Sequence, residues 1–135
     1  MALVLLIGRD ASLLEGLSQS LVAACHAVRT AYSVSDAIDV AVAQPPLVVV
    51  VERALAAQDM RSLRIPLASG GALMLFGGPA ERGLALSPAF GRAALADITL
   101  PLERHRLVAL IGKVEERALA AGRARRDTPP ETRPV

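Results

Sequence analysis

The sequence predicts a single α/β domain with a doubly wound parallel sheet of five strands and helices on both faces. The first observation is Leu47 to Glu52, where four consecutive valines follow Pro45-Pro46. A short β-branched run without alternation is typical of a strand covered on both faces, as in the middle of a parallel sheet. The second is the length, because 135 residues suit one domain and not two. The third is that five strand-like runs alternate with five helical segments.

The elements follow from the apolar periodicity and from Gly and Pro punctuation. Strands are predicted at 2–7, 28–31, 48–51 (closed by Glu52), 72–76 and 97–100. Helices are predicted at 11–24, from Ser35 to Pro45, at 53–63, as a short or broken helix within 80–96, and from 102 to Gly122. Either Asp10 or Ser12 can cap the first helix, the latter through a capping box with Glu15. Right-handed crossovers around a central third strand predict the flavodoxin-like order 2-1-3-4-5.

We expect residues 1–121 to form this domain and residues 122–135 to be a disordered, basic, Pro-rich tail. Much of the formal charge of +2 lies in that tail, so the body is close to neutral and carries no nucleic-acid footprint. Cys25 is the sole cysteine, which excludes a disulfide framework. No segment suits a membrane span or a signal peptide, so a cytoplasmic location is expected. His26 and His105 are expected on the surface.

Three stretches resemble one known family. They are Val4-Leu5-Leu6-Ile7-Gly8-Arg9-Asp10 with Leu13-Leu14-Glu15-Gly16-Leu17, then His26-Ala27-Val28-Arg29-Thr30-Ala31 running through to Pro45-Pro46-Leu47-Val48-Val49-Val50-Val51-Glu52, and finally Ile98-Thr99-Leu100-Pro101-Leu102. The chain from residue 3 to about 118 is similar to the receiver domain of response regulators. That family works by phosphorylation of an aspartate at the end of the third strand, with a bound Mg²⁺.

The resemblance also implies that the family's chemistry is missing here. Its metal-binding acidic pair falls on Gly8 and Arg9, and only the next residue, Asp10, is acidic. Its phosphoacceptor falls on Glu52, or on Val51 if the register slips by one residue.

The remaining family positions are also altered. The hydroxyl residue that ends the fourth strand falls on Phe76, and the aromatic residue of the fifth strand falls on Asp97. The lysine that contacts the phosphoryl group falls on Leu100, and Lys113, the only lysine of the chain, lies within the last helix.

The physical chemistry of these residues agrees with the resemblance. A Mg²⁺ ion prefers oxygen ligands that include carboxylates, and Arg9 would put a guanidinium where the ion would sit. Glu52 is one methylene longer than aspartate and is at best a partial mimic of phosphoaspartate. We therefore expect a pseudo-receiver with no metal and no cofactor, in which the Arg9 guanidinium pairs with Glu52 and also with Asp10.

The leading hypothesis is a stand-alone, non-enzymatic signalling module that acts by phosphorylation-independent protein binding. In the receiver family, partners or a second copy dock on the face of the fourth helix, fifth strand and fifth helix. Here that face would include Asp97, Arg104, Arg106, Lys113 and Arg117, and a homodimer would use the last helix. Two alternatives remain open: an orthodox phosphorylated response regulator, and a small-molecule or nucleotide-binding domain with its ligand between the first and third strands.

Overall fold

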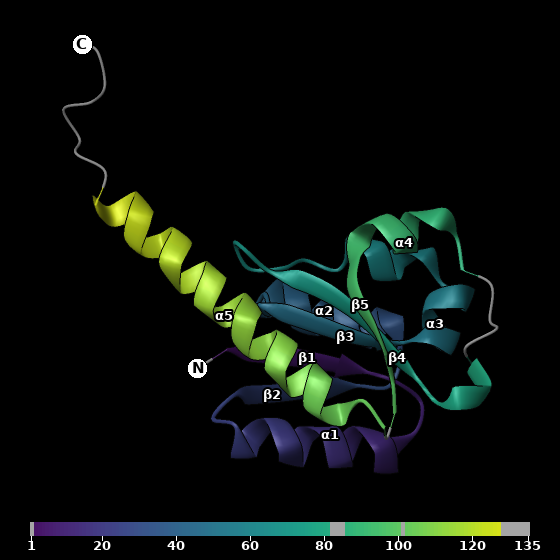
Figure 1. The fold of residues 1–135 in the computed structure, drawn as a ribbon. Coiled ribbons are helices and arrows are strands. Elements are labelled where there is room, and N and C mark those ends of the chain that lie inside the picture. Colours follow the sequence, from purple (N-terminus) through teal and green to yellow (C-terminus); the bar gives the residue numbers. More distant parts are fainter. Residues whose placement is uncertain (1, 82–85, 101, 128–135) are drawn as a thin grey trace.

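The computed structural model describes residues 2–81, 86–100 and 102–127, without the side chains of 81 and 123–127. Its five strands form one all-parallel sheet in the order β2-β1-β3-β4-β5, as the sequence predicted (Figure 1). The strands are β1 (Leu3–Ile7), β2 (Ala27–Ala31), β3 (Val48–Glu52), β4 (Ala72–Gly77) and β5 (Ala94–Thr99). Helices separate successive strands, which gives the doubly wound arrangement.

The helices form one layer on each face of the sheet (Figure 1). The elements are α1 (Ala11–Ala23), α2 (Val34–Ala43), α3 (Arg53–Gln58), α4 (Pro88–Ala93) and α5 (Arg104–Asp127), with short 3₁₀ turns η1 (Met60–Arg64) and η2 (Pro79–Glu81). Residues of α1 and α5 share one apolar cluster, and residues of α2, α3 and α4 share the other.

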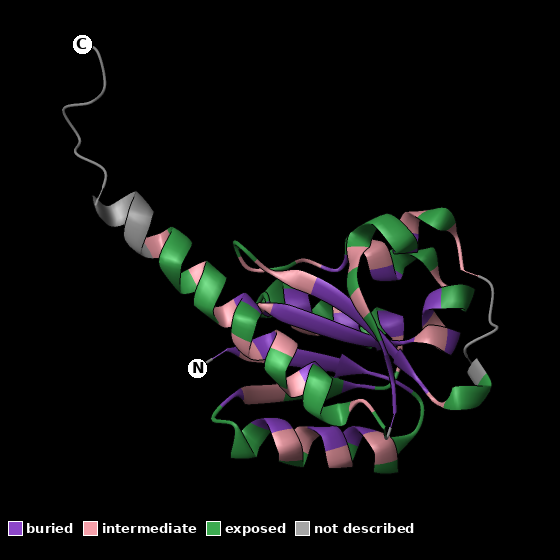
Figure 2. Cartoon of the chain, in the orientation of Figure 1, coloured by how far each residue is buried: buried purple, intermediate pink, exposed green. Residues whose placement is uncertain are grey.

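Strand β3 explains why the valine run does not alternate. Val48 and Val50 belong to the cluster with α1 and α5, whereas Val49 and Val51 belong to the cluster with α2 and α4. All four side chains are fully buried, and Figure 2 shows buried residues along the central strands. Because both faces of the strand are covered, every position selects an apolar residue.

Two helix starts differ in detail from the prediction. Asp10, and not Ser12, caps α1, because its Oδ1 accepts a hydrogen bond from the Leu13 backbone N–H at 3.2 Å. Ser33 caps α2 by accepting from the Asp36 N–H at 3.1 Å, so this helix begins before the predicted Ser35. Both caps satisfy N–H groups that the first helical turn leaves without a partner.

The helix predicted at 53–63 is broken. Helix α3 ends at Gln58, and the Asp59 carboxylate then accepts from the Arg61 backbone N–H at 3.0 Å and so caps η1. A short acidic side chain that bonds to the backbone in this way competes with helix continuation.

Strand β5 and helix α5 are longer than predicted. Strand β5 begins at Ala94 instead of 97, and its pairing with β4 shifts between the partners of Ala94 and Ala96. Helix α5 continues past Gly122 to Asp127, because one glycine costs a helix only about 1 kcal/mol and the following residues are mostly good helix formers. Residues 128–135 of the predicted tail lie outside the described residues.

The prediction of a surface position is wrong for His26. The side chain is buried, its Nδ1 accepts from the Ala2 backbone N–H at 3.3 Å, and it lies 3.9 Å from Glu115 Oε2. Its place beside the start of β1 makes it part of the packing between β1 and α5. His105 is exposed, as expected. No helix in the described part of the chain is long and apolar enough to cross a membrane.

Candidate functional site at the C-terminal edge of the sheet

The ends of β1 and β3 bring Arg9 and Glu52 together. The two strands are neighbours with Ile7 opposite Val51, so the residues that follow lie on the same edge. The Arg9 Nε donates a hydrogen bond to Glu52 Oε1 at 3.2 Å, with side chains that are 53% and 9% exposed. The predicted pairing of Arg9 with Glu52 is therefore confirmed. It is a single Nε contact and not a bidentate one.

Of Glu52 and Val51, it is Glu52 whose side chain meets Arg9. It occupies the N-cap position of α3, but its carboxylate makes no capping hydrogen bond and is directed to Arg9. The side chain of Val51 is fully buried in the core, on the α2 side. The Asp10 carboxylate caps α1 and, within the described residues, makes no hydrogen bond or ion pair with Arg9, so the expected second contact of Arg9 is not formed.

A second ion pair lies directly beside the first. The Nη1 of Arg53, the residue after Glu52, contacts the Oδ2 of Asp97 on β5 across the end of β4. The side chain of Arg53 is only 13% exposed and that of Asp97 is 46% exposed. Arg9, Glu52, Arg53 and Asp97 thus form a row of alternating charges from β1 to β5, which we call the charge row.

Arg53 was not among the predicted site residues. One signal in the sequence points to it, because a cation in the first turn of a helix opposes the helix dipole and needs a nearby anion. That anion, Asp97, is 44 residues further along the chain and was assigned to the docking face instead.

Phe76, at the hydroxyl position of the resemblance, packs against the start of the site. Its ring is fully buried at the end of β4, opposite Glu52. A Cβ atom added to Gly8 would lie 3.1 Å from the ring's Cζ, 3.3 Å from Leu14 Cδ2 and 3.6 Å from Glu52 Cβ. The ring and the bare backbone of Gly8 therefore pack against each other, and there is no room for a carboxylate at residue 8 without movement of the ring.

Leu100, at the lysine position of the resemblance, belongs to the core. It is buried in the cluster with Leu107 and Ile111 of α5, and its backbone N–H donates to the Gly77 carbonyl at 2.8 Å. An apolar side chain in this place cannot contact an anion bound at Glu52.

The residues at this edge do not fit a Mg²⁺ ion. A guanidinium stands where the acidic pair would lie, the Glu52 carboxylate is bound to it, and the Asp10 carboxylate caps a helix. Within residues 2–81, 86–100 and 102–127, no three His, Cys, Asp or Glu side chains are grouped so that they could hold a metal ion.

The predicted docking face is only partly brought together. Arg106, Lys113 and Arg117 are spaced by seven and four residues, which places them on one side of α5. Arg104 lies on the other side, where it lines a small cavity with Gly16 of α1. Asp97 belongs to the charge row, and Arg106 pairs with Glu103 at 3.1 Å.

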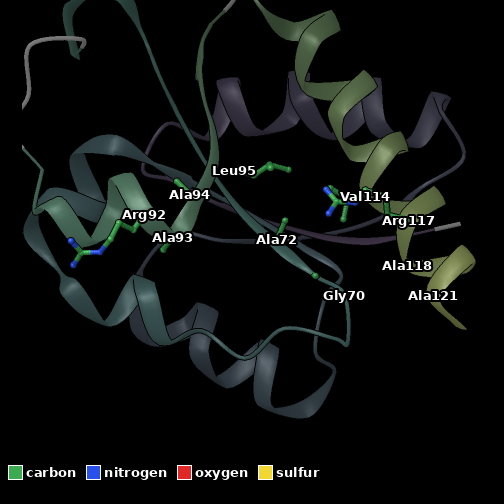
Figure 3. Close-up of a pocket in the computed structure, with 11 residues that line it drawn as sticks. Gly70, Ala72, Arg92, Ala93, Ala94, Leu95, Val114, Arg117, Ala118 and Ala121 are labelled. Atoms are coloured by element: carbon green, nitrogen blue, oxygen red, sulfur yellow. The ribbon is translucent and has the colours of Figure 1, made fainter. Parts of the chain in front are cut away.

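Two open cavities lie at opposite ends of the strands, one at the C-terminal ends and one at the N-terminal ends. One of about 310 Å³ opens beside Arg9 and is also lined by Tyr32, Ser35, Asp59 and Arg61. Besides Arg9, this cavity has one other cationic residue, Arg61. The charge of Arg61 is already neutralised, because its Nη2 lies 2.8 Å from Asp59 Oδ2. A larger groove of about 570 Å³ lies between the start of β5 and α5 (Figure 3).

The fold is that of receiver domains. A two-component response regulator from Clostridium difficile superimposes with a TM-score of 0.69 at 16% identity, covering 87% of this chain and 98% of the other. The pseudo-receiver domain of the CikA protein superimposes with a TM-score of 0.63 at 18% identity, covering 84% and 97%. NtrX from Brucella abortus, in complex with ADP, superimposes with a TM-score of 0.69 at 17% identity over 91% of this chain.

This chain spans only 28% of the length of NtrX, but it spans 97% of the CikA domain and 98% of the Clostridium difficile regulator. Comparison by sequence matches no family profile and no curated protein. The structural similarity at these identities is a similarity of fold.

Proposed function

We propose that this chain is a pseudo-receiver, a signalling module with the receiver fold that acts by binding another protein and without being phosphorylated. The observation that carries the proposal is the Arg9–Glu52 ion pair. In the receiver fold this edge of the sheet holds the metal and the phosphoacceptor. Here a permanent cation neutralises the carboxylate at the phosphoacceptor position.

The rest of the edge supports the same proposal. Arg53 and Asp97 tie the end of β3 to β5 with charges that require no phosphoryl group. Phe76 and Leu100, which replace a hydroxyl and a lysine, are both buried among apolar side chains. A receiver switches because phosphorylation changes the charge at this edge. With the charges built into the sequence, the module is expected to keep one conformation and to present one binding surface.

Acetyl phosphate with Mg²⁺, followed by intact-mass measurement, tests the proposal against an orthodox response regulator. We expect no phosphate adduct on this chain under conditions in which an orthodox receiver domain, included as a control, becomes labelled. An adduct on the wild-type chain that is absent from Glu52→Ala would overturn phosphorylation independence. An adduct that persists in Glu52→Ala would lie elsewhere and leave the assignment of the edge intact.

A further inference from the structure

A groove of about 570 Å³ lies at the N-terminal ends of the strands, away from the charge row (Figure 3). We call it the α5–β5 groove. One wall is the second half of α5, the other wall is the junction of α4 with β5, and the loop before β4 also lines it. Pockets that hold small organic molecules have volumes of roughly 300–1,000 Å³, so the groove is large enough for such a ligand.

The surface between the two walls is apolar. Leu95 is exposed in the groove, and Ala94 and Val114 line it as well. Gly70 comes so close to α5 that a Cβ atom added to it would lie 3.3 Å from that of Ala118. Among the lining residues that the structure describes, none is acidic and none carries an aromatic ring. The groove therefore favours an aliphatic ligand, because it offers no carboxylate to a cation and no ring on which a nucleotide base could stack.

Each wall of the groove carries an arginine. Arg92 lies in the last turn of α4, and Arg117 reaches from α5 toward Leu95 on β5 (Figure 3). Both arginines are exposed, and neither forms an ion pair with an acidic side chain among the described residues. Glu115 and Glu116, the acidic residues nearest to Arg117 in the sequence, are not part of the lining. The groove thus combines an apolar floor with an uncompensated positive charge on each side.

We propose that the α5–β5 groove binds an aliphatic dicarboxylic acid. The methylene chain of the acid lies on Leu95 and on the apolar side chains of α5, and its two carboxylates pair with Arg92 and Arg117. A guanidinium group suits this role, because its planar donors match the two oxygens of a carboxylate. The inference goes beyond the proposed function, since it depends neither on protein binding nor on the absence of phosphorylation.

Two simpler acids match the groove less well. A monocarboxylic acid of the same length would leave one of the two arginines without a partner. A compact dianion such as succinate would meet the charges but would leave the apolar floor in contact with water. Its binding would then depend on exposed ion pairs alone, and such pairs contribute little.

Isothermal titration calorimetry of the full chain with decanedioate tests the proposal. Decanoate has one carboxylate on a chain of the same length, and succinate has both carboxylates without the long chain. Each acid is titrated into the wild type, Arg92→Gln and Arg117→Gln. The control is the double variant Arg29→Gln with Arg64→Gln, because both of these arginines are exposed and lie outside the groove. Circular dichroism and melting curves check that every variant is folded.

We expect decanedioate to bind at one site. Decanoate should bind about fivefold more weakly, because an exposed ion pair contributes up to roughly 1 kcal/mol. Either groove variant should weaken decanedioate binding by about the same factor, and the control pair should leave it unchanged. Succinate should show no measurable binding, because it makes no apolar contact with the floor.

The position of the bound acid is measured by the chemical shifts of backbone amides in nuclear magnetic resonance spectra. Decanedioate should shift the amides of Gly70, Leu95 and Ala118, which line the groove. The amide of Val22, an exposed residue of α1 outside the groove, should not shift.

The other outcomes overturn the proposal in distinguishable ways. Equal affinities for decanoate and decanedioate would exclude pairing at both ends of the acid. Succinate binding as tightly as decanedioate would identify a general attraction of anions to surface arginines. Amide shifts confined to residues outside the groove, or a control pair that weakens binding as much as the groove variants do, would place the acid elsewhere. Absence of decanedioate binding at millimolar concentration would reject the groove as a site for this class of ligand. The proposed function has its own test with acetyl phosphate, so neither result decides the other.

Discussion

The Arg9 Nε donates a hydrogen bond to Glu52 Oε1 over 3.2 Å, and this contact joins the ends of two neighbouring strands across 43 residues of sequence. Glu52 is almost buried, whereas just over half of the Arg9 side chain is exposed. Glu52 therefore depends on this contact for a partner, whereas water can also solvate the Arg9 guanidinium. The contact of the Arg9 guanidinium with Glu52 supports our proposal that this residue supplies a permanent positive charge in place of a metal ion.

The first prediction concerns the energy of this pair. Because Arg9 is more than one-third exposed, Arg9→Ala should lower the free energy of unfolding by no more than about 1 kcal/mol. Glu52→Ala removes the acceptor of the same contact, so the double variant should lose less than the sum of the two single losses. Urea unfolding of the four proteins measures the coupling. Strictly additive losses would show that the pair contributes nothing to stability.

The second prediction is that Mg²⁺ does not stabilise the protein. A guanidinium at the metal position repels the ion, and the one nearly buried carboxylate is already bound to it. The melting temperature should be the same in millimolar MgCl₂ and in NaCl of equal ionic strength. A reproducible rise with Mg²⁺ alone would contradict the pseudo-receiver assignment.

The third prediction concerns the packing of Phe76 against Gly8. Gly8→Ala places a Cβ 3.1 Å from the ring and should destabilise the protein by about 1–3 kcal/mol, as overpacking does. Gly112→Ala, within α5, is the matched control, because among the described residues no atom beyond the helix's own backbone lies within 4 Å of the new Cβ. That change should stabilise the helix by up to about 1 kcal/mol.

A double variant separates crowding from other effects at residue 8. Phe76→Leu shortens the side chain that the new methyl meets, so Gly8→Ala should cost less in that background than in the wild type. Equal costs in both backgrounds, measured by urea unfolding, would show that the ring does not limit residue 8.

The fourth prediction concerns pH. The hydrogen bond from the Arg61 side chain, followed by that from its backbone, holds the pKa of Asp59 below its ordinary value of 3.8. A lowered pKa means that Asp59 contributes stability above pH 3.8, and that this contribution disappears as the pH falls through the lower value in the folded state. Asp59→Asn should therefore show a smaller loss of stability than the wild type over this acid range. Melting curves in low-salt buffers measure the difference, and parallel profiles would contradict it.

Local patterns were sufficient to predict most of the fold. The valine run of β3, the helical spacing of apolar residues and the Gly and Pro punctuation each depend on neighbours in the sequence. Together with the right-handed crossover, they led to the observed strand order. The boundaries were less predictable where a single side chain decides them, as Asp59 does when it ends α3 and caps η1.

In the candidate site, only contacts between the ends of neighbouring strands could be predicted from the sequence. Because neighbouring parallel strands end at the same edge, the contact of Arg9 with Glu52 followed from the strand order alone. The prediction of a further contact with Asp10 was wrong, since the capping of α1 takes that carboxylate. The pairing of Arg53 with Asp97 crosses the end of β4 and depends on the exact directions of two side chains.

The sequence by itself determined the fold class and the strand order, because residue type, local periodicity and the hand of the crossovers carry that information. Only the tertiary structure decided that Phe76 packs on Gly8, that His26 is buried beside Ala2, and that Arg92 and Arg117 flank one groove. The physical reason is that these relations are packing contacts between segments distant in sequence. Their geometry depends on how whole layers of the fold meet, and no local pattern encodes it.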